Sequence, residues 1–240
     1  MNLLPLSFFV LVLVFVFGAF TPVRALELSP MEMDFTTTGN NSSHVFTVEN
    51  KFSKDIAVEL KIYKRRINLK GEESRDDTND FLIFPRQIKL APGQKKPVRV
   101  SWQGPTEVKK EIPYRLVLEQ LPIDFKKKEN QGQKIDIDFL LKYVASLYVL
   151  SEPAKSEIVI ENLEKRKSRL HFILKNNGSK HLVVSKFVLI GGSGEIPLVD
   201  TSLRQVLGRN ILAESALEFD LPWPSELQAQ HLELVKVHVE

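Results

Sequence analysis

The residues of this sequence that could perform catalysis do not assemble into an enzyme motif. The chain has no cysteine, which excludes disulfides, thiol nucleophiles and Cys-ligated metal centres. Its five histidines lack metal-ligand spacing, and we expect His171 and His181, on either side of a turn, to lie on the surface. The run Gly191–Gly194 lacks the spacing of a nucleophile elbow, so a secreted hydrolase is disfavoured. We therefore expect no enzyme activity, no metal and no cofactor.

The chemistry that the sequence does offer is recognition by an extended strand. Within Lys134–Val144 the side chains alternate between an apolar face, with Ile135, Ile137, Phe139, Leu141 and Tyr143, and a polar face, with Asp136, Asp138 and Lys142. Alternation with period two predicts a β-strand. Two interpretations stay open: the apolar face packs on the protein's own core, or the strand is an exposed edge whose apolar row is offered to another chain.

The charge pattern argues against a nucleic-acid partner. The 240 residues contain 33 Lys and Arg against 30 Asp and Glu, a formal net charge of +3, without a basic domain. The short basic runs Lys64–Arg66 and Lys126–Lys128 are typical of solvated strand ends and loops. Nothing resembles a phosphate-binding loop, and we expect no nucleic-acid partner and no small-molecule substrate.

Short runs of β-branched and aromatic residues separated by turn signals must position the alternating strand. We expect strands at 26–29, 31–35, 44–49, 57–66, 81–84, 87–90, 98–102, 114–121, 134–150, 157–161, 169–175, 182–190, 195–199, 215–221 and 232–239. The stretch from Gly71 onward, with its acidic residues, is expected to be a turn. Such spacing predicts an all-β chain of two immunoglobulin-like β-sandwich domains, residues 26–150 and 151–240.

The first 25 residues are expected to lie outside these domains. Leu3–Phe20 is almost wholly apolar, and Val23-Arg24-Ala25 follows as a small-residue cleavage site. This pattern is typical of a secretory signal peptide, residues 1–25, although an uncleaved membrane anchor is the alternative. An exported chain without cysteine suits the bacterial periplasm.

Five segments of the sequence, in order, resemble the periplasmic pilus-assembly chaperones of the chaperone–usher system. They are Asn79–Val100, with its apolar strand, Pro-Gly turn and Val-Arg-Val, then Tyr114–Pro122, Lys142–Val149, Phe172–Ser179 and Gly208–Ser215. The resemblance covers nearly the whole chain after residue 25, and it is strongest to the archaic branch of the family.

The resemblance implies a boomerang of two sandwiches that holds fimbrial subunits by donor-strand complementation and delivers them to an outer-membrane usher. In such β-augmentation, main-chain hydrogen bonds give affinity and alternate side chains fill pockets of the subunit. The donor residues implied here are Ile135, Ile137, Phe139 and Leu141. Self-association of the chain without a subunit is left open, and so is the alternative of a two-domain immunoglobulin-like structural or adhesive protein that lends no strand.

The resemblance also implies basic residues that anchor the subunit's C-terminal carboxylate between the domains. By its position in the strand, Lys142 is implied as the first anchor. The alternative is that Lys142 is a solvated lysine on the outer face of the sheet. The family's second anchor is an arginine in the first strand, where this chain has Met31, Glu32 and Met33. Arg115, with Arg86 behind it, is the substitute that we predict.

Overall fold

The computed structural model describes residues 25–122, 140–150, 153–191, 194–196, 204–223 and 236–239. Within these ranges the chain is built of strands joined by loops, with one short 3-10 helix, η1 (Asn40–Ser42). No helix among the described residues is long and apolar enough to cross a membrane.

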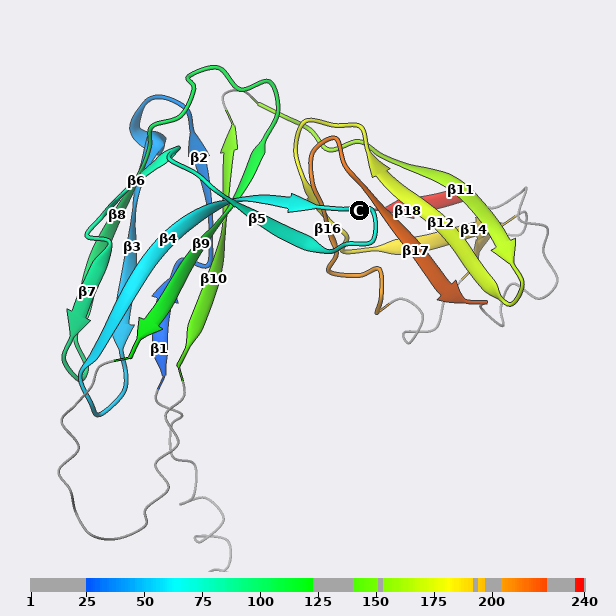
Figure 1. The fold of residues 1–240 in the computed structure, drawn as a ribbon. Coiled ribbons are helices and arrows are strands. Elements are labelled where there is room, and N and C mark those ends of the chain that lie inside the picture. The colour runs from blue at the N-terminus through cyan, green and yellow to red at the C-terminus, as the bar shows by residue number, and fades with distance from the viewer. Residues whose placement is uncertain are drawn as a thin grey trace, which may run out of the picture.

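The first lobe is a sandwich of two sheets (Figure 1). One sheet has the order β1-β3-β8-β6, formed by β1 (Leu26–Ser29), β3 (Ser43–Asn50), β8 (Lys95–Trp102) and β6 (Phe81–Phe84). The other has the order β2-β10-β9-β4-β5, formed by β2 (Glu32–Thr36), β10 (Lys142–Leu150), β9 (Ile112–Leu121), β4 (Ile56–Ile67) and β5 (Glu73–Asp77), with β7 (Gln87–Leu90) also paired to β4.

Alternation along the strands fills the space between these two sheets. In β9, Leu116 and Leu118 are fully buried, and Val98 and Val100 of β8 meet them from the opposite sheet in one apolar core. The odd-numbered residues of β9 therefore lie on the outer face of their sheet, because successive side chains of a strand point to opposite faces.

The second lobe has its own core. Its strands are β11 (Ile158–Arg166), β12 (Arg169–Asn176), β13 (Leu182–Val183), β14 (Phe187–Gly191), β15 (Gly194–Ile196), β16 (Asn210–Ile211), β17 (Ala216–Pro222) and β18 (Lys236–Val239), arranged in sheets β11-β12-β17, β13-β16 and β15-β14-β18. Phe172 stacks against both Phe187 and Phe219, with ring centroids 5.2 Å apart in each pair. The predicted all-β fold of two immunoglobulin-like sandwiches in a boomerang arrangement is confirmed by this architecture.

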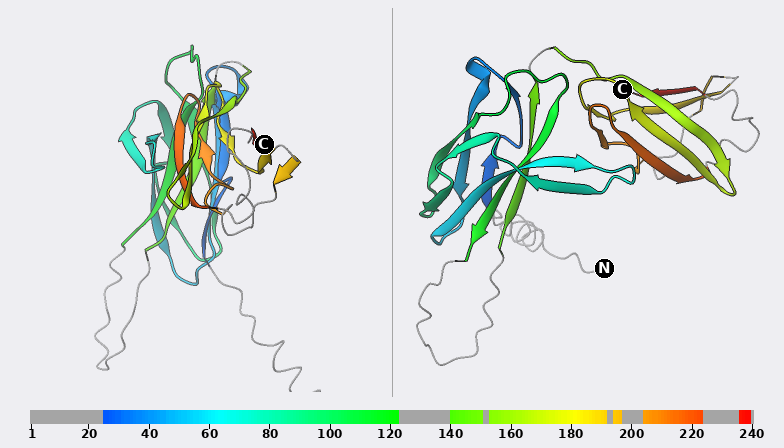
Figure 2. Two further views of the ribbon diagram at one scale, coloured as in Figure 1. Left: turned by 90° about the vertical axis from the view of Figure 1, so that its right-hand side faces the viewer. Right: turned by 45° about the horizontal axis from the view of Figure 1, so that its top comes forward.

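The long hairpin of β4 and β5 reaches from the first lobe to the second (Figure 2). Ile67, at the end of β4, packs against the core of the second lobe. The Glu218 N–H of β17 donates a hydrogen bond of 2.8 Å to the Leu69 carbonyl in the hairpin turn. Gly71 adopts φ +81°, the left-handed conformation that glycine tolerates, where the turn passes Arg209. The hairpin thus clasps the two lobes together.

Most predicted strands are present, with three corrections. The stretch after Gly71 contains a strand, β5, rather than only a turn. The single strand expected at 182–190 is divided into β13 and β14, and β16 was not predicted. The domain boundary proposed at 150/151 falls between the last residue of the first core, Val149, and the first strand of the second lobe.

Candidate functional site

The alternating strand enters the described structure near its C-terminal end. Ile135, Ile137 and Phe139 lie outside the described residues. Leu141 is half-buried against the first core, and its carbonyl accepts a 2.9 Å hydrogen bond from the Gln120 N–H of β9. Leu141 therefore contributes to the protein's own core.

One edge of β10 is open over its first four residues. β10 pairs with β9 from Lys142 to Val149, but on its other side β2 pairs only from Ser146 to Leu150. The Ser146 N–H reaches the Met31 carbonyl at 2.9 Å, so by alternation the backbone groups of Lys142 and Val144 face the same side. Among the described residues no strand covers them there. An uncovered edge of this kind accepts a strand from another chain.

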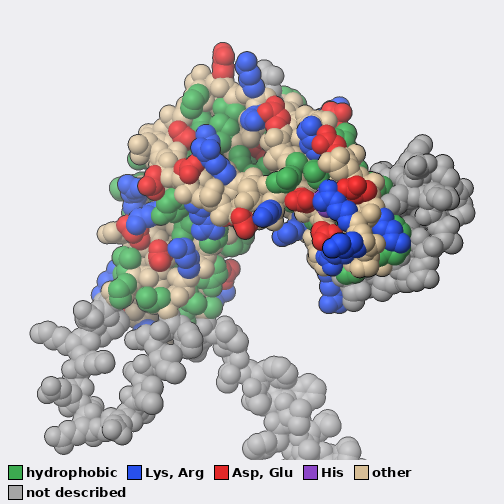
Figure 3. Space-filling view, turned by 45° about the vertical axis from the view of Figure 1, so that its right-hand side comes forward, with side chains coloured by type: hydrophobic (Ala, Val, Ile, Leu, Met, Phe, Trp, Pro, Cys, Tyr) green, Lys and Arg blue, Asp and Glu red, His purple; other side chains and the backbone are tan. Residues whose placement is uncertain are grey.

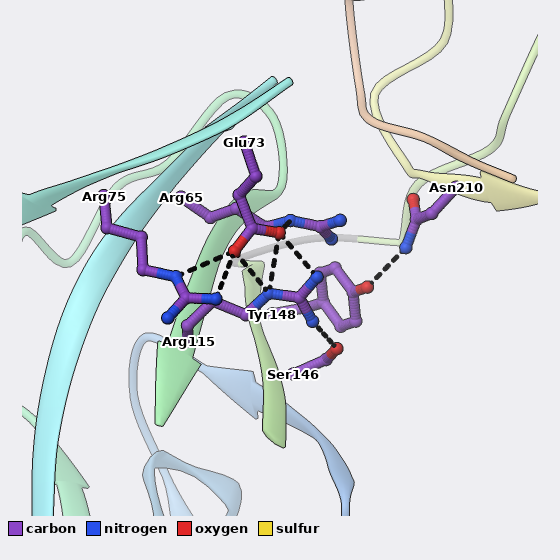
Figure 4. A network of polar contacts seen from close by, with 7 residues as sticks. All are labelled: Arg65, Glu73, Arg75, Arg115, Ser146, Tyr148 and Asn210. Atoms are coloured by element: carbon purple, nitrogen blue, oxygen red, sulfur yellow. Dashed lines mark hydrogen bonds and ion pairs between the residues drawn. The ribbon is translucent and has the colours of Figure 1, made fainter. Parts of the chain in front are cut away.

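A cluster of charged side chains lies on the outer face of the same sheet, beside Ser146 (Figure 4). Glu73 of β5 is held by three guanidinium groups, those of Arg65 of β4, Arg75 of β5 and Arg115 of β9. Its Oε2 accepts hydrogen bonds from Arg65 Nε at 2.8 Å and from Arg115 Nη2 at 2.7 Å, and its Oε1 accepts one from Arg75 Nε at 2.8 Å. Arg115 Nη1 donates to the Ser146 hydroxyl at 2.5 Å. We call Arg65, Glu73, Arg75 and Arg115 the arginine cluster.

Strand pairing explains why these side chains meet. Arg115 lies opposite Ser146 in the β9–β10 ladder and opposite Tyr63 in the β9–β4 ladder. Arg65 lies two residues beyond Tyr63 on the same face of β4, directly opposite Arg75 of β5. Three adjacent strands therefore present their charged residues to one spot.

Burial makes the electrostatics of the arginine cluster strong. Arg65 is only 8% exposed, and its Nη1 has no hydrogen-bond partner among the described residues. Burial, together with the neighbouring positive charge of Arg115, lowers the pKa of Arg65. Burial alone would raise the pKa of Glu73, but hydrogen bonds from Arg115 and Arg75 and the charges of Arg115 and Arg65 outweigh it and lower the pKa to about 2. Glu73 is thus a carboxylate at any physiological pH.

The arginine cluster stands at the junction of the two lobes. Next to Ser146, the hydroxyl of Tyr148 accepts a 2.6 Å hydrogen bond from the Asn210 amide of the second lobe. The Tyr148 ring stacks on His181, whose Nδ1 is 2.7 Å from Glu111. His181 is therefore enclosed in the interface, and His171 is buried in the second lobe, so the expected surface position is wrong for both histidines. Figure 3 shows charged side chains of both lobes gathered around the hollow between them.

A cavity of about 650 Å³ opens beside Arg65. Its walls include Ile67 and Ile112 of the first lobe and Leu212 of the second, together with the cationic Lys64 and Lys109. Arg65 is one of the residues that line this cavity, which therefore lies between the two lobes.

Of the three predicted carboxylate anchors, only Arg115 lies in the arginine cluster. Lys142 is at the start of β10, about 13 Å along the strand from Ser146, and its Nζ is 3.8 Å from Glu119. Arg86 is exposed in the connection between β6 and β7, where its carbonyl accepts a hydrogen bond from the Leu60 N–H. Glu32 lies opposite Ser146, at the beginning of β2.

Sequence reasoning missed Arg65, Glu73 and Arg75. Arg65 was expected in a solvated basic run, and its burial overturns that expectation. The alternation of β4 would have shown that Arg65 shares a face with Lys61 and Tyr63, away from the core residues Leu60 and Ile62. No signal in the sequence indicated that Arg65 would be buried on this face. Among the described residues, no group of three or more His, Asp or Glu side chains could hold a metal ion.

Solved structures share this fold. The chain is similar to a chain of the chaperone-tip adhesin complex in CFA/I fimbriae biogenesis, with 19% identity, coverage of 90% of this chain and 93% of that chain, and a TM-score of 0.58. It is similar to the class 5 fimbriae chaperone CfaA, with 18% identity, coverage of 90% and 99%, and a TM-score of 0.56. It is also similar to a chain of the CsuC–CsuE chaperone-tip adhesion subunit pre-assembly complex from the archaic Csu pili of Acinetobacter baumannii, with 16% identity, coverage of 84% and 94%, and a TM-score of 0.54.

A sequence search of curated proteins gives no match. The family comparison is decisive: residues 28–149, half of the chain, match the family described as pili and flagellar-assembly chaperone, PapD N-terminal domain. This match spans β2 to β10 and contains both the open edge and the arginine cluster. The chain therefore belongs to the family of pili and flagellar-assembly chaperones.

Proposed function

We propose that this protein is a non-enzymatic periplasmic chaperone that binds pilus or fimbrial subunits by donor-strand complementation and delivers them to an outer-membrane usher. The observation that carries the proposal is the open edge of β10 directly beside the arginine cluster. An open edge supplies main-chain pairing, and a group of guanidiniums at its end supplies a partner for a terminal carboxylate. Structural relatives that include chaperone–adhesin complexes agree with this role.

The donor side chains in this proposal are Ile135, Ile137 and Phe139. Burial of each apolar side chain in a subunit groove contributes about 1.5–3 kcal/mol, part of which offsets the cost of ordering the strand. Leu141 contributes less to the complex because it is already half-buried in the chaperone's own core.

The carboxylate anchor in this proposal is Arg115 together with Arg65. A strand added to the open edge of β10 would meet the start of β2 at Ser146, and Arg115 already donates to that residue. Lys142 and Arg86 are less suitable, because neither lies near Ser146. Glu32 would repel an incoming carboxylate, whereas the guanidiniums of the arginine cluster outweigh that single charge.

The proposed function also requires export of the chain to the periplasm. Residues 1–24 lie outside the described structure, and β1 begins at Leu26 with its side chain buried. We propose that a signal peptidase cleaves after Ala25, which would leave β1 intact. The mass of the protein recovered from the periplasm tests this: a chain that begins at Leu26 supports cleavage, and a chain that retains residues 1–25 supports an anchor.

The central test is a charge placed in the donor row. We expect Ile137→Asp to fold normally and to lose co-purification with a fimbrial subunit co-expressed from the same gene cluster, because a buried carboxylate cannot be paired in the groove. Asp138→Asn, on the opposite face, is the matched control and should retain capture. If Ile137→Asp captures the subunit as well as the unmodified chain does, the immunoglobulin-like structural alternative is favoured.

A further inference from the structure

The position of Glu73 is unusual for a structural ion pair. Its carboxylate is the single acidic partner recorded for Arg65, Arg75 and Arg115 among the described residues, so three guanidiniums share one negative charge. Both oxygens of Glu73 are fully used by hydrogen bonds. The arrangement matches what the guanidiniums would offer to any carboxylate that entered between them.

The strand that delivers Glu73 lies at an edge of its sheet. Among the described strands, β5 is at the sheet edge and pairs with β4 alone. Glu73 forms the last pair of that ladder, opposite Ile67 and next to the hairpin turn. Withdrawal of the Glu73 side chain therefore needs no break in the centre of a sheet. Rotation about its own side-chain bonds is enough, so the hairpin turn can keep its hydrogen bond from Glu218 to Leu69.

The guanidiniums themselves are fixed more firmly than Glu73. Arg115 comes from the central strand β9 and is also held by Ser146, and Arg65 is buried in β4. If Glu73 moved away, the two arginines would remain in place as a preorganised anion site. Glu32, exposed opposite Ser146, has no ion pair recorded with either arginine in the described structure.

We propose that Glu73 is an internal stand-in for a ligand carboxylate: it occupies the anion site of Arg65 and Arg115 in the free chain and yields that site to the terminal carboxylate of a bound subunit. This inference rests on the proposed function for the identity of the ligand, but not for the existence of the site. The low pKa of Glu73, about 2, agrees with a carboxylate held as an anion by its surroundings. The chaperone would thus carry its own competitor, which weakens the hold on a subunit and favours its release.

If Glu73 competes with a ligand carboxylate, its removal should change the measured affinity for that ligand. The apparent affinity of a site is its intrinsic affinity multiplied by the fraction of molecules in which the site is free. Removing the internal occupant therefore raises the apparent affinity. Glu73→Gln keeps the size of the side chain and removes its charge. We expect this variant to bind a free carboxylate about tenfold more tightly than the unmodified chain does.

The test uses acetate as the probe and the full chain. The Nε–H signals of Arg65 and Arg115 are followed by ¹⁵N NMR, assigned from Arg65→Lys and Arg115→Lys, while acetate replaces chloride at constant ionic strength. In the Glu73→Gln chain both signals should shift saturably, whereas in the unmodified chain they should barely move. Glu72→Gln is the matched control: it removes the neighbouring charge, whose carboxylate accepts from Asn68, and should behave like the unmodified chain.

Two outcomes would overturn the proposal. The first is an equal response to acetate with and without the Glu73 charge. The second is loss of the folded state in both Glu73→Gln and Glu73→Ala, because a stand-in must be dispensable to the fold. The acetate response is independent of subunits, so a positive result together with unimpaired capture by Ile137→Asp would leave the anion site standing and sink the proposed function instead.

Discussion

Two consecutive arginines in β4 have opposite surroundings. The side chain of Arg65 is 7% exposed and bonds to Glu73, whereas the side chain of Arg66 is 68% exposed and pairs with Asp76 on the surface. Arg115 and Lys142 make a second such contrast, one enclosed in the arginine cluster and the other half-exposed beside Glu119. Residue type and charge are therefore poor guides to a site in this fold. The strand face and the neighbouring side chains decide which of these basic residues is enclosed.

The largest effect that would sharpen this contrast concerns stability. We expect Arg65→Ala to lower the free energy of unfolding by about 2–4 kcal/mol, because a partly buried carboxylate loses a partner and a buried space opens. Arg66→Ala should cost less than about 1 kcal/mol, as exposed ion pairs do. Urea denaturation of both variants measures the difference. Equal costs would mean that the burial of Arg65 has no energetic consequence.

The second effect concerns subunit binding. We expect Arg115→Gln to weaken the affinity for a fimbrial subunit by at least about tenfold, because a charge-assisted hydrogen bond contributes about 1.5–3 kcal/mol. Lys142→Gln should change the affinity by less than about twofold, since Lys142 lies far along β10 from Ser146. Titration of each purified variant with the same subunit measures both values, and thermal melts verify that each is folded. If Lys142→Gln lost more affinity than Arg115→Gln, Lys142 rather than Arg115 would be the carboxylate anchor.

The contrast also explains which parts of the structure could be predicted from sequence. Strands such as β6 and β7 were predicted with their observed bounds, because β6 is a short apolar run, β7 alternates apolar and polar residues, and turn signals flank them. The strand β5, with the sequence ESRDD, carries no such side chain. It is a strand because β4 beside it supplies hydrogen bonds, which is a non-local cause that propensity does not record.

The site was less predictable than the fold for a similar reason. Arg115 was found through the resemblance to pilus chaperones, but its partners depend on pairing register. Register sets Ser146 and Tyr63 opposite Arg115, and it arises from contacts between strands far apart in the chain. The burial of Arg65 beside Glu73 likewise depends on the pairing of β4 with β5, so the sequence around it indicated only a solvated basic run. The prediction of Ile135, Ile137 and Phe139 as donors stays a prediction.

The smallest effect isolates Glu73 through pH. Its pKa is near 2 in the folded chain and 4.5 as the ordinary value, so the unfolded chain binds the proton more readily. The carboxylate therefore stabilises the fold above about pH 4.5, and this contribution is lost as pH falls toward 2. Between pH 5.5 and 3, the stability of the unmodified chain should fall by about 1 kcal/mol more than that of Glu73→Gln, after allowance for solvent screening at a partly exposed site. Urea denaturation of the two chains across this range measures the difference, with Glu72→Gln as the matched control. Parallel stability curves for the unmodified chain and Glu73→Gln would mean that the three arginines do not hold Glu73 as an anion. In that case buried and exposed charges would not differ in their effect, and the carboxylate anchor inferred from that difference would lose its support.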